Sequence, residues 1–261
     1  MGAAAVMDDF FAGIRYFGQG LVMLLRRPKL LLIGMLPAVL TTALLLGGMI
    51  ALIANISDLT ALVTPFADHW AAGWQLATRV TAGIALVSVA ALLGLVGFTA
   101  LTLIVGGPFY EHIAERLEDD LDVAESHASP SGWKMLLLGV RDGVVLMLRS
   151  LAFTVVLFLA GFVPVVGQTL VPALLALVTG WFIALEVVAV AFYRRGIGLR
   201  GRTAMLRSRR MLAVGLGLPA ALLSTIPLMS IVVMPVAFAG GVLVALDVLG
   251  LARPREQLGR E

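Results

Sequence analysis

Two uncharged stretches of equal length occupy much of the second half of this chain. Each is 36 residues long, one lying between Arg149 and Glu186 and the other between Arg210 and Asp247. A helix of roughly 20 apolar residues crosses the ~30 Å hydrocarbon core of a bilayer, and a water-soluble core has no need of longer uncharged runs. The composition agrees, because 60% of the 261 residues are hydrophobic and 13% are charged, against roughly 45–50% and 25% in soluble domains. The sequence therefore predicts an all-α integral membrane protein with a single membrane domain over residues 1–261.

The two stretches share a proline pattern, which indicates an internal repeat. Seven residues separate Pro164 from Pro172 in the first stretch, and seven separate Pro227 from Pro235 in the second. Because proline lacks an N–H and disfavours helix before it, we expect such prolines to stop one helix and start the next.

Arm length then distinguishes two arrangements. Helical arms at 150–163 and 173–185 would each be about 20 Å long, too short to cross the hydrocarbon core. Re-entrant helical hairpins over 150–193 and 211–247 fit this length best. The alternative, in which the arms cross completely and their charged ends extend to the headgroups, stays open.

Earlier segments are expected to cross the membrane completely. Residues 30–57 carry no charge before Asp58, and like residues 80–106 they are long enough as helices to span the core. Residues 7–25 have apolar side chains at helical spacing, which predicts an N-terminal amphipathic helix in the membrane interface. We expect Gly107-Pro108 to end the second span and residues 109–149 to form a cytoplasmic surface helix and loop.

The distribution of basic residues predicts the orientation. Of the 19 Lys and Arg residues, only Arg79 lies in the loop between the two spans. By the positive-inside rule the side with the other 18 is cytoplasmic. This predicts a multi-pass protein of the inner (plasma) membrane with cytoplasmic N- and C-termini. The basic residues flank apolar spans, so the expected partner is the lipid bilayer and not nucleic acid.

Several short motifs resemble those of one family of membrane proteins. They are Tyr16-Phe17-Gly18-Gln19-Gly20 with Pro28 and Pro37, Gly107-Pro108-Phe109 followed by Ala114-Glu115-Arg116-Leu117-Glu118, Pro164-x-x-Gly167-Gln168-Thr169-x-x-Pro172, and Ile226-Pro227-Leu228 with Met234-Pro235-Val236-Ala237. In this combination the chain resembles the CysZ sulfate permease family, grouped with etoposide-induced-protein-like membrane proteins, from about Gly13 to Asp247. The resemblance implies two full spans with two partly inserted hairpins, a homo-oligomer, and sulfate uptake.

The chain departs from the family's pattern near Pro28. Where similar permeases carry a Gly and two Arg after this proline, this chain has Lys29, Leu31 and Leu32. Arg26 and Arg27 precede the proline and could substitute after a change of register. The cargo therefore stays open, with sulfate as the anion that the resemblance implies.

The turn of the first hairpin, Gly167-Gln168-Thr169, is one candidate site for anion binding. A helix beginning near Pro172 would leave its first N–H groups and its positive dipole end inside the bilayer. Broken helices of this kind bind anions in transporters. Alternatively, Gln168 and Thr169 only satisfy the backbone of a buried turn.

Charged side chains near the spans provide further candidates. Arg26, Arg27 and Lys29 could concentrate and dehydrate an anion, or could bind lipid headgroups. Glu186 stands between apolar runs, where an ionised carboxylate is costly and often functional, unless it reaches water at a hairpin base. The same two interpretations as for the first group apply to Arg194, Arg195, Arg200, Arg202, Arg207, Arg209 and Arg210.

The sequence indicates no enzyme, cofactor or metal. There is no cysteine, and His69, His112 and His127 lack the spacing of metal ligands. A P-loop, a serine elbow and a His-Glu metal helix are all missing. The favoured function is a membrane permease or channel-like protein for a small inorganic anion. The alternative is a non-transporting scaffold that organises lipids or other membrane proteins.

Overall fold

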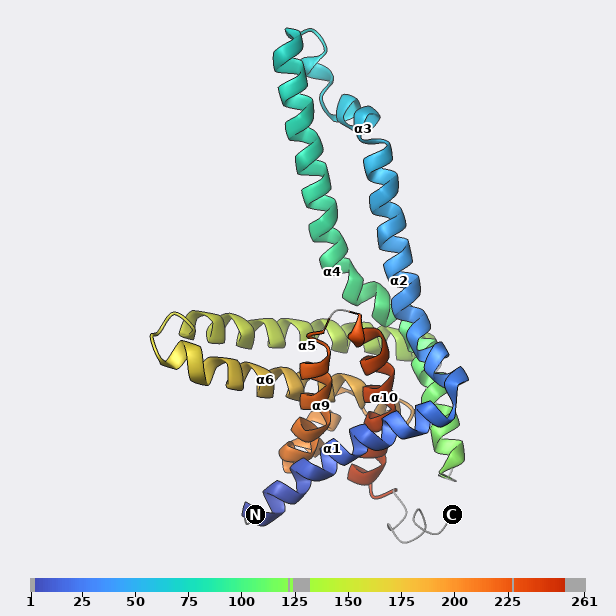
Figure 1. The fold of residues 1–261 in the computed structure, drawn as a ribbon. Coiled ribbons are helices and arrows are strands. Elements are labelled where there is room, and N and C mark those ends of the chain that lie inside the picture. The colour runs from blue at the N-terminus through green and yellow to red at the C-terminus, as the bar shows by residue number, and fades with distance from the viewer. Residues whose placement is uncertain (1–2, 122, 124–131, 227, 252–261) are drawn as a thin grey trace. The chain divides into compact units, whose positions relative to one another are not determined.

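The computed structural model describes residues 3–121, 123, 132–226 and 228–251, and all regular structure among them is helical. In chain order the elements are α1 (Ala3–Arg26), α2 (Pro28–Ala54), α3 (Ile56–Val63), the short η1 (Pro65–Ala67), α4 (Ala72–Asp120), α5 (Gly132–Ala160), α6 (Val166–Val187), α7 (Ala189–Tyr193), α8 (Leu199–Ser208), α9 (Arg210–Leu223) and α10 (Met229–Val248) (Figure 1).

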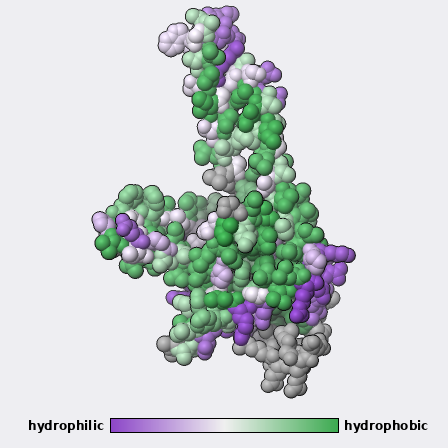
Figure 2. All heavy atoms as spheres, in the orientation of Figure 1, coloured by the Kyte–Doolittle hydropathy of each residue, from purple (hydrophilic) through white to green (hydrophobic). Residues whose placement is uncertain are grey.

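Among the described residues, five helical segments are long and apolar enough to cross a membrane. They are Pro28–Ala54, Ala72–Gly94, Leu137–Ala160, Gly167–Val187 and Met229–Val248. Figure 2 shows that apolar side chains cover most of the hairpin formed by α5 and α6, as expected of a surface that contacts lipid tails. The predicted all-α, multi-pass membrane protein is thereby confirmed.

Pro164 lies in the turn between α5 and α6, as the sequence predicted, but three other prolines do not interrupt their helices. Pro172 lies inside α6 and Pro235 inside α10, while Pro108 lies inside α4, which continues to Asp120 and does not end at Gly107-Pro108. Membrane helices tolerate proline because neighbouring helices, side chains and local adjustments satisfy the backbone groups that it frees. The predicted arms of the first hairpin are therefore too short, since α5 has 29 residues and α6 has 22.

The turns of the two hairpins share one backbone feature. In the described chain the only non-glycine residues with positive φ are Val165, at 68°, and Leu228, at 63°. Each directly follows the first proline of its repeat. A bulky residue in this region is strained, so the structure supports the internal repeat. Pro164 lies in the first turn, whereas Pro227 lies outside the described residues.

Contacts between Cα atoms divide the chain into two compact units, residues 1–36 with 106–261 and residues 37–105. In the first unit α1 packs on α9 and α10, and α6 packs on α9. Glycines allow these helices to approach backbone to backbone: a Cβ at Gly13 would lie 2.7 Å from the Leu216 nitrogen, and one at Gly241 would lie 2.6 Å from the Val187 oxygen. Small residues are the usual means of close packing between membrane helices.

The second unit comprises the C-terminal part of α2, α3, η1 and the N-terminal part of α4. Trp70 and Trp74 are exposed near its polar end, as is typical of side chains at the membrane interface. Arg79 donates a hydrogen bond to Asp68 at 2.8 Å. Arg79, the one arginine of residues 37–105, is thus neutralised by an ion pair within this unit.

Candidate functional site

The basic group of Arg26, Arg27 and Lys29 lies where α1 ends and α2 begins. Pro28 occupies the first position of α2, where a missing N–H costs little because that group has no helical partner. All three basic side chains are exposed. Arg27 Nη2 lies 2.6 Å from Asp120 Oδ1 near the end of α4, so this arginine is partly neutralised.

A pocket of about 520 Å³ opens beside this basic group. The first turns of α2 contribute Arg27, Pro28, Lys29, Leu30 and Ile33 to its lining, and α4 contributes His112 and Arg116. Arg26 is not part of the lining. The sequence indicated only that His112 lacks the spacing of a metal ligand, and it gave Arg116 no role in a site. His112 and Arg116 are four positions apart and so lie on one face of the helix. The sequence does not indicate which other helix this face contacts.

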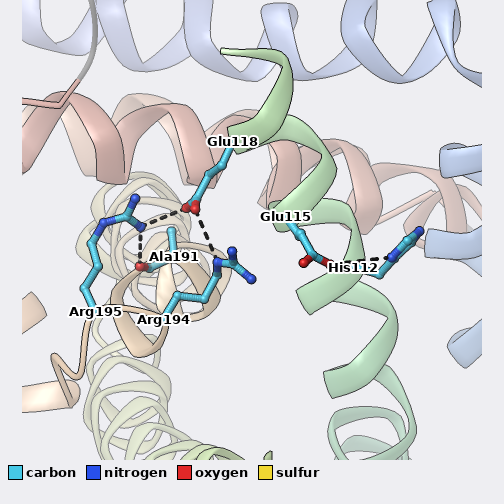
Figure 3. Close-up of polar contacts among 6 residues, drawn as sticks. All are labelled: His112, Glu115, Glu118, Ala191, Arg194 and Arg195. Atoms are coloured by element: carbon cyan, nitrogen blue, oxygen red, sulfur yellow. Dashed lines mark hydrogen bonds and ion pairs between the residues drawn. The ribbon is translucent and has the colours of Figure 1, made fainter. Parts of the chain in front are cut away.

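A buried ion pair network links α4 to the end of α7. Glu118 has a side chain only 5% exposed and lies 3.2 Å from Arg194 Nε and 2.8 Å from Arg195 Nη1 (Figure 3). Arg195 also donates to the Ala191 carbonyl at 2.9 Å. These two arginines therefore neutralise a buried carboxylate, a role that neither of the two interpretations from sequence included.

A second buried network surrounds Asp142 in α5. Its Oδ2 accepts hydrogen bonds from the Tyr193 hydroxyl at 2.7 Å and from the Leu199 nitrogen at 2.9 Å. Burial raises the pKa of Tyr193, which keeps its hydroxyl protonated as a donor. Arg202 lies 3.7 Å from the same oxygen and is 1% exposed, so it does not face lipid headgroups.

A third network joins α1 to the ends of α8 and α10. Arg209 lies 2.7 Å from Asp9 Oδ1 and 2.8 Å from Asp247 Oδ2. The hydrogen bond to Asp9 is the main reason that the pKa of Arg209 is raised. Nearby, burial first and the charge of Asp247 second raise the pKa of Tyr16 to about 12. Of the seven arginines between 194 and 210, three remain exposed: Arg200, Arg207 and Arg210.

The tip residues Gly167, Gln168 and Thr169 lie in the first turn of α6, which begins at Val166 and not near Pro172. Gln168 and Thr169 are exposed. The Thr169 hydroxyl donates to the Val165 carbonyl at 2.7 Å, which is the backbone role that the sequence left as an alternative. The tip lies at the free end of the α5–α6 hairpin (Figure 1), and the structure does not bring it to the basic group at α2.

Glu186 lies at the opposite end of α6 and is partly buried. Its negative charge adds to burial, the larger cause, in raising the pKa of Tyr110 in α4. It therefore belongs to the interior of the first unit. Among the described residues, no group of three or more His, Cys, Asp and Glu side chains could hold a metal ion.

Comparisons with known proteins place most of the chain in one group. A family model described as sulfate transporter CysZ/etoposide-induced protein 2.4 matches residues 16–235. The sulfate transporter CysZ of Salmonella typhimurium is 27% identical over 243 residues, which cover 90% of this chain and 92% of that protein. The sulfate transporter CysZ of Vibrio parahaemolyticus is 27% identical over 147 residues, which cover 55% of this chain and 59% of that protein.

Proposed function

Because this chain belongs to the family of sulfate transporter CysZ and etoposide-induced protein 2.4, we propose that it is a membrane permease for a small inorganic anion, in the first place sulfate. The observation that carries the proposal is the extent of the match, which runs from α1 into α10 and includes both proline repeats. The CysZ members named in these comparisons are transporters, which agrees with the expectation that this chain is not an enzyme. The same match disfavours the alternative of a scaffold that transports nothing.

The residues proposed to contact the anion form two separate groups. Arg26, Arg27 and Lys29 form an exposed cationic group at the start of α2, and fixed cations raise the local concentration of an anion. The tip residues Gly167, Gln168 and Thr169 contribute the first N–H groups of α6, which carry a partial positive charge. Glu186, near the other end of α6, is proposed as a charged residue within the membrane on the route that the anion takes. These roles rest on exposure, charge and helix polarity.

The proposed arrangement in the membrane has two full spans and two re-entrant hairpins within a single membrane domain. The length of α9 supports it, because 14 residues make about 21 Å of helix, shorter than the ~30 Å hydrocarbon core. For the α5–α6 hairpin, length no longer separates re-entry from full crossing. Charge bias supports an inner-membrane protein with both termini in the cytoplasm, and the family resemblance supports a homo-oligomer.

Uptake of radiolabelled sulfate by bacterial cells that lack their own sulfate uptake tests the proposal. Cells that express this chain are expected to accumulate sulfate above cells with an empty vector, with excess unlabelled phosphate and chloride as selectivity controls. Replacing Arg26, Arg27 and Lys29 together by Gln should lower uptake severalfold, since these fixed charges would no longer raise the local concentration of the anion.

The matched control replaces Arg200, Arg207 and Arg210 by Gln, which removes the same charge from exposed positions outside the basic group. This control should retain most of the uptake. Equal loss in both triple variants would remove the basic group from the proposed site. Absence of uptake by the unmodified chain, when it is present in the membrane, would favour the scaffold.

A further inference from the structure

The residues that line the pocket beside the basic group are expected to lie at different depths in the membrane. A candidate span begins at Pro28, so we expect Lys29 at the level where the polar headgroups meet the hydrocarbon. Ile33, which also lines the pocket, lies one turn further along α2, about 6 Å deeper at 1.5 Å per residue. The pocket therefore extends from the headgroup level into the apolar layer.

The surface inside the pocket is almost entirely carbon. The lining residues that can supply this carbon are Pro28, Leu30 and Ile33, together with the apolar stems of the long basic side chains. A bare dianion would lose its hydration there without gaining hydrogen bonds, which is costly. An occupant with an apolar chain as well as an anionic group fits the surface better, and the volume of about 520 Å³ falls in the range of roughly 300–1,000 Å³ that is usual for ligand pockets.

Basic side chains surround this carbon surface. Arg27 is engaged by Asp120 at 2.6 Å, and His112 Nδ1 lies 3.9 Å from Glu115. Lys29 and Arg116 have no hydrogen bond or ion pair within the part of the chain that the structure describes. Two cations thus remain available among the lining residues, one from α2 and one from α4.

We propose that this pocket binds one anionic phospholipid, with its phosphate at Lys29 and Arg116 and the first part of an acyl chain against Leu30 and Ile33. The charge of the rim matches the phosphate, and the carbon wall matches the chain. The bilayer supplies such molecules at the depth where the pocket opens. The lipid would fill the space between the start of α2 and residues 112–116 of α4. Lipid binding at this place does not depend on whether the chain transports sulfate.

Native mass spectrometry of the purified full-length chain tests the proposal, with phosphatidylglycerol and phosphatidylcholine of the same acyl chains as probes. The anionic lipid is expected to bind roughly 25-fold more tightly, because two cations each contribute about a factor of five near a membrane surface. The double variant K29Q/R116Q should lose this preference. The double variant R200Q/R207Q, which removes the same charge from exposed positions of α8, should keep it.

Two further measurements distinguish a pocket from a charged surface. The variant I33W fills the carbon-walled space but keeps every cation, and it should also weaken binding of phosphatidylglycerol. On the unmodified chain, glycerol phosphate, which has the headgroup but no acyl chain, should fail to displace the lipid at equal concentration.

Three results would overturn the proposal: equal binding of the two lipids, unchanged lipid binding in a folded I33W variant, or effective displacement by glycerol phosphate, which would indicate a site for free anions. If I33W does not fold, the glycerol phosphate measurement and the K29Q/R116Q variant still decide. No sulfate flux enters these measurements, so the lipid site and the proposed permease can fail separately.

Discussion

Glu118 illustrates how single charged residues are accommodated in the first unit. Its carboxylate is nearly inaccessible to solvent, and both nearby guanidinium groups donate hydrogen bonds to it. Taking a charge out of water is costly, and opposite charges with good hydrogen-bond geometry offset that cost. Asp142 and Arg209 follow the same principle in their own networks.

Replacing Glu118 by Gln is expected to destabilise the protein strongly. The substitution keeps the size of the side chain but leaves Arg194 and Arg195 without a counter-charge, which typically costs about 3–5 kcal/mol for a buried pair. Thermal unfolding in detergent, followed by tryptophan fluorescence, should show a clearly lower Tm. The control is Glu115→Gln, one turn earlier in α4 and 54% exposed, for which the change should be at most about 1 kcal/mol. Equal shifts in the two variants would contradict the role of the network.

The sequence could identify which residues are charged near the spans but not which of them meet. Asp9 and Arg209 are separated by 200 positions, and no periodicity within either segment relates them. For the same reason the sequence placed Arg202 among arginines facing either lipid or anion, whereas the structure buries it against Asp142. The exposed basic group at Arg26, Arg27 and Lys29 needed no tertiary information, because it sits at a helix boundary that Pro28 marks.

At the scale of elements, the close contact between α1 and α9 depends on the absence of side chains. At Gly13 a Cβ would lie 2.8 Å from the Gly215 carbonyl carbon, and backbone atoms cannot move aside as a flexible side chain can. Gly18 in the same helix has open space around it.

The substitution Gly13→Ala is therefore expected to lower the Tm, because overpacking typically costs about 1–3 kcal/mol. The substitution Gly18→Ala should leave the Tm unchanged or raise it, since alanine favours helix over glycine by roughly 1 kcal/mol. The same tryptophan-fluorescence melts in detergent measure both. A lower Tm for Gly18→Ala alone would show that the packing of α1 is misassigned.

The depth of the first hairpin tip can be measured by cysteine labelling, because the chain has no cysteine of its own. Val165 is the suitable position, since it is 73% exposed, whereas a side chain at Gly167 would overlap the Gly161 carbonyl. In the re-entrant arrangement, Val165→Cys should react slowly with a membrane-impermeant maleimide from either face. Trp74→Cys, at an exposed position in the first turn of α4, should react rapidly from the periplasmic face. Rapid periplasmic labelling of Val165→Cys would mean that α5 and α6 cross completely.

Helix boundaries were the least predictable part of the elements. The rule that proline ends a helix comes from its missing N–H, and in water that loss is rarely compensated inside a helix. Pro172 and Pro235 lie within packed or lipid-facing helices, where continuing the helix satisfies more backbone groups than stopping would. The repeat itself was predictable, and the positive φ at both Val165 and Leu228 gives it a structural counterpart.

At the scale of the whole molecule, the fold class followed from composition because a bilayer permits few structures. Long uncharged runs must form helices there, since no water is available for unpaired backbone groups. The packing of α1, α6, α9 and α10 could not be predicted in the same way. Glycines in a sequence indicate that some helices approach one another closely, but they do not indicate which helices form the pair.

We propose above all that this chain by itself passes sulfate across a membrane. The direct measurement is the flux of radiolabelled sulfate into liposomes that contain only the purified protein, with phosphate and chloride measured in parallel. We predict sulfate flux well above that of protein-free liposomes and without added ATP. Flux no higher than in protein-free liposomes for all three anions, with the protein folded and inserted, would contradict the claim.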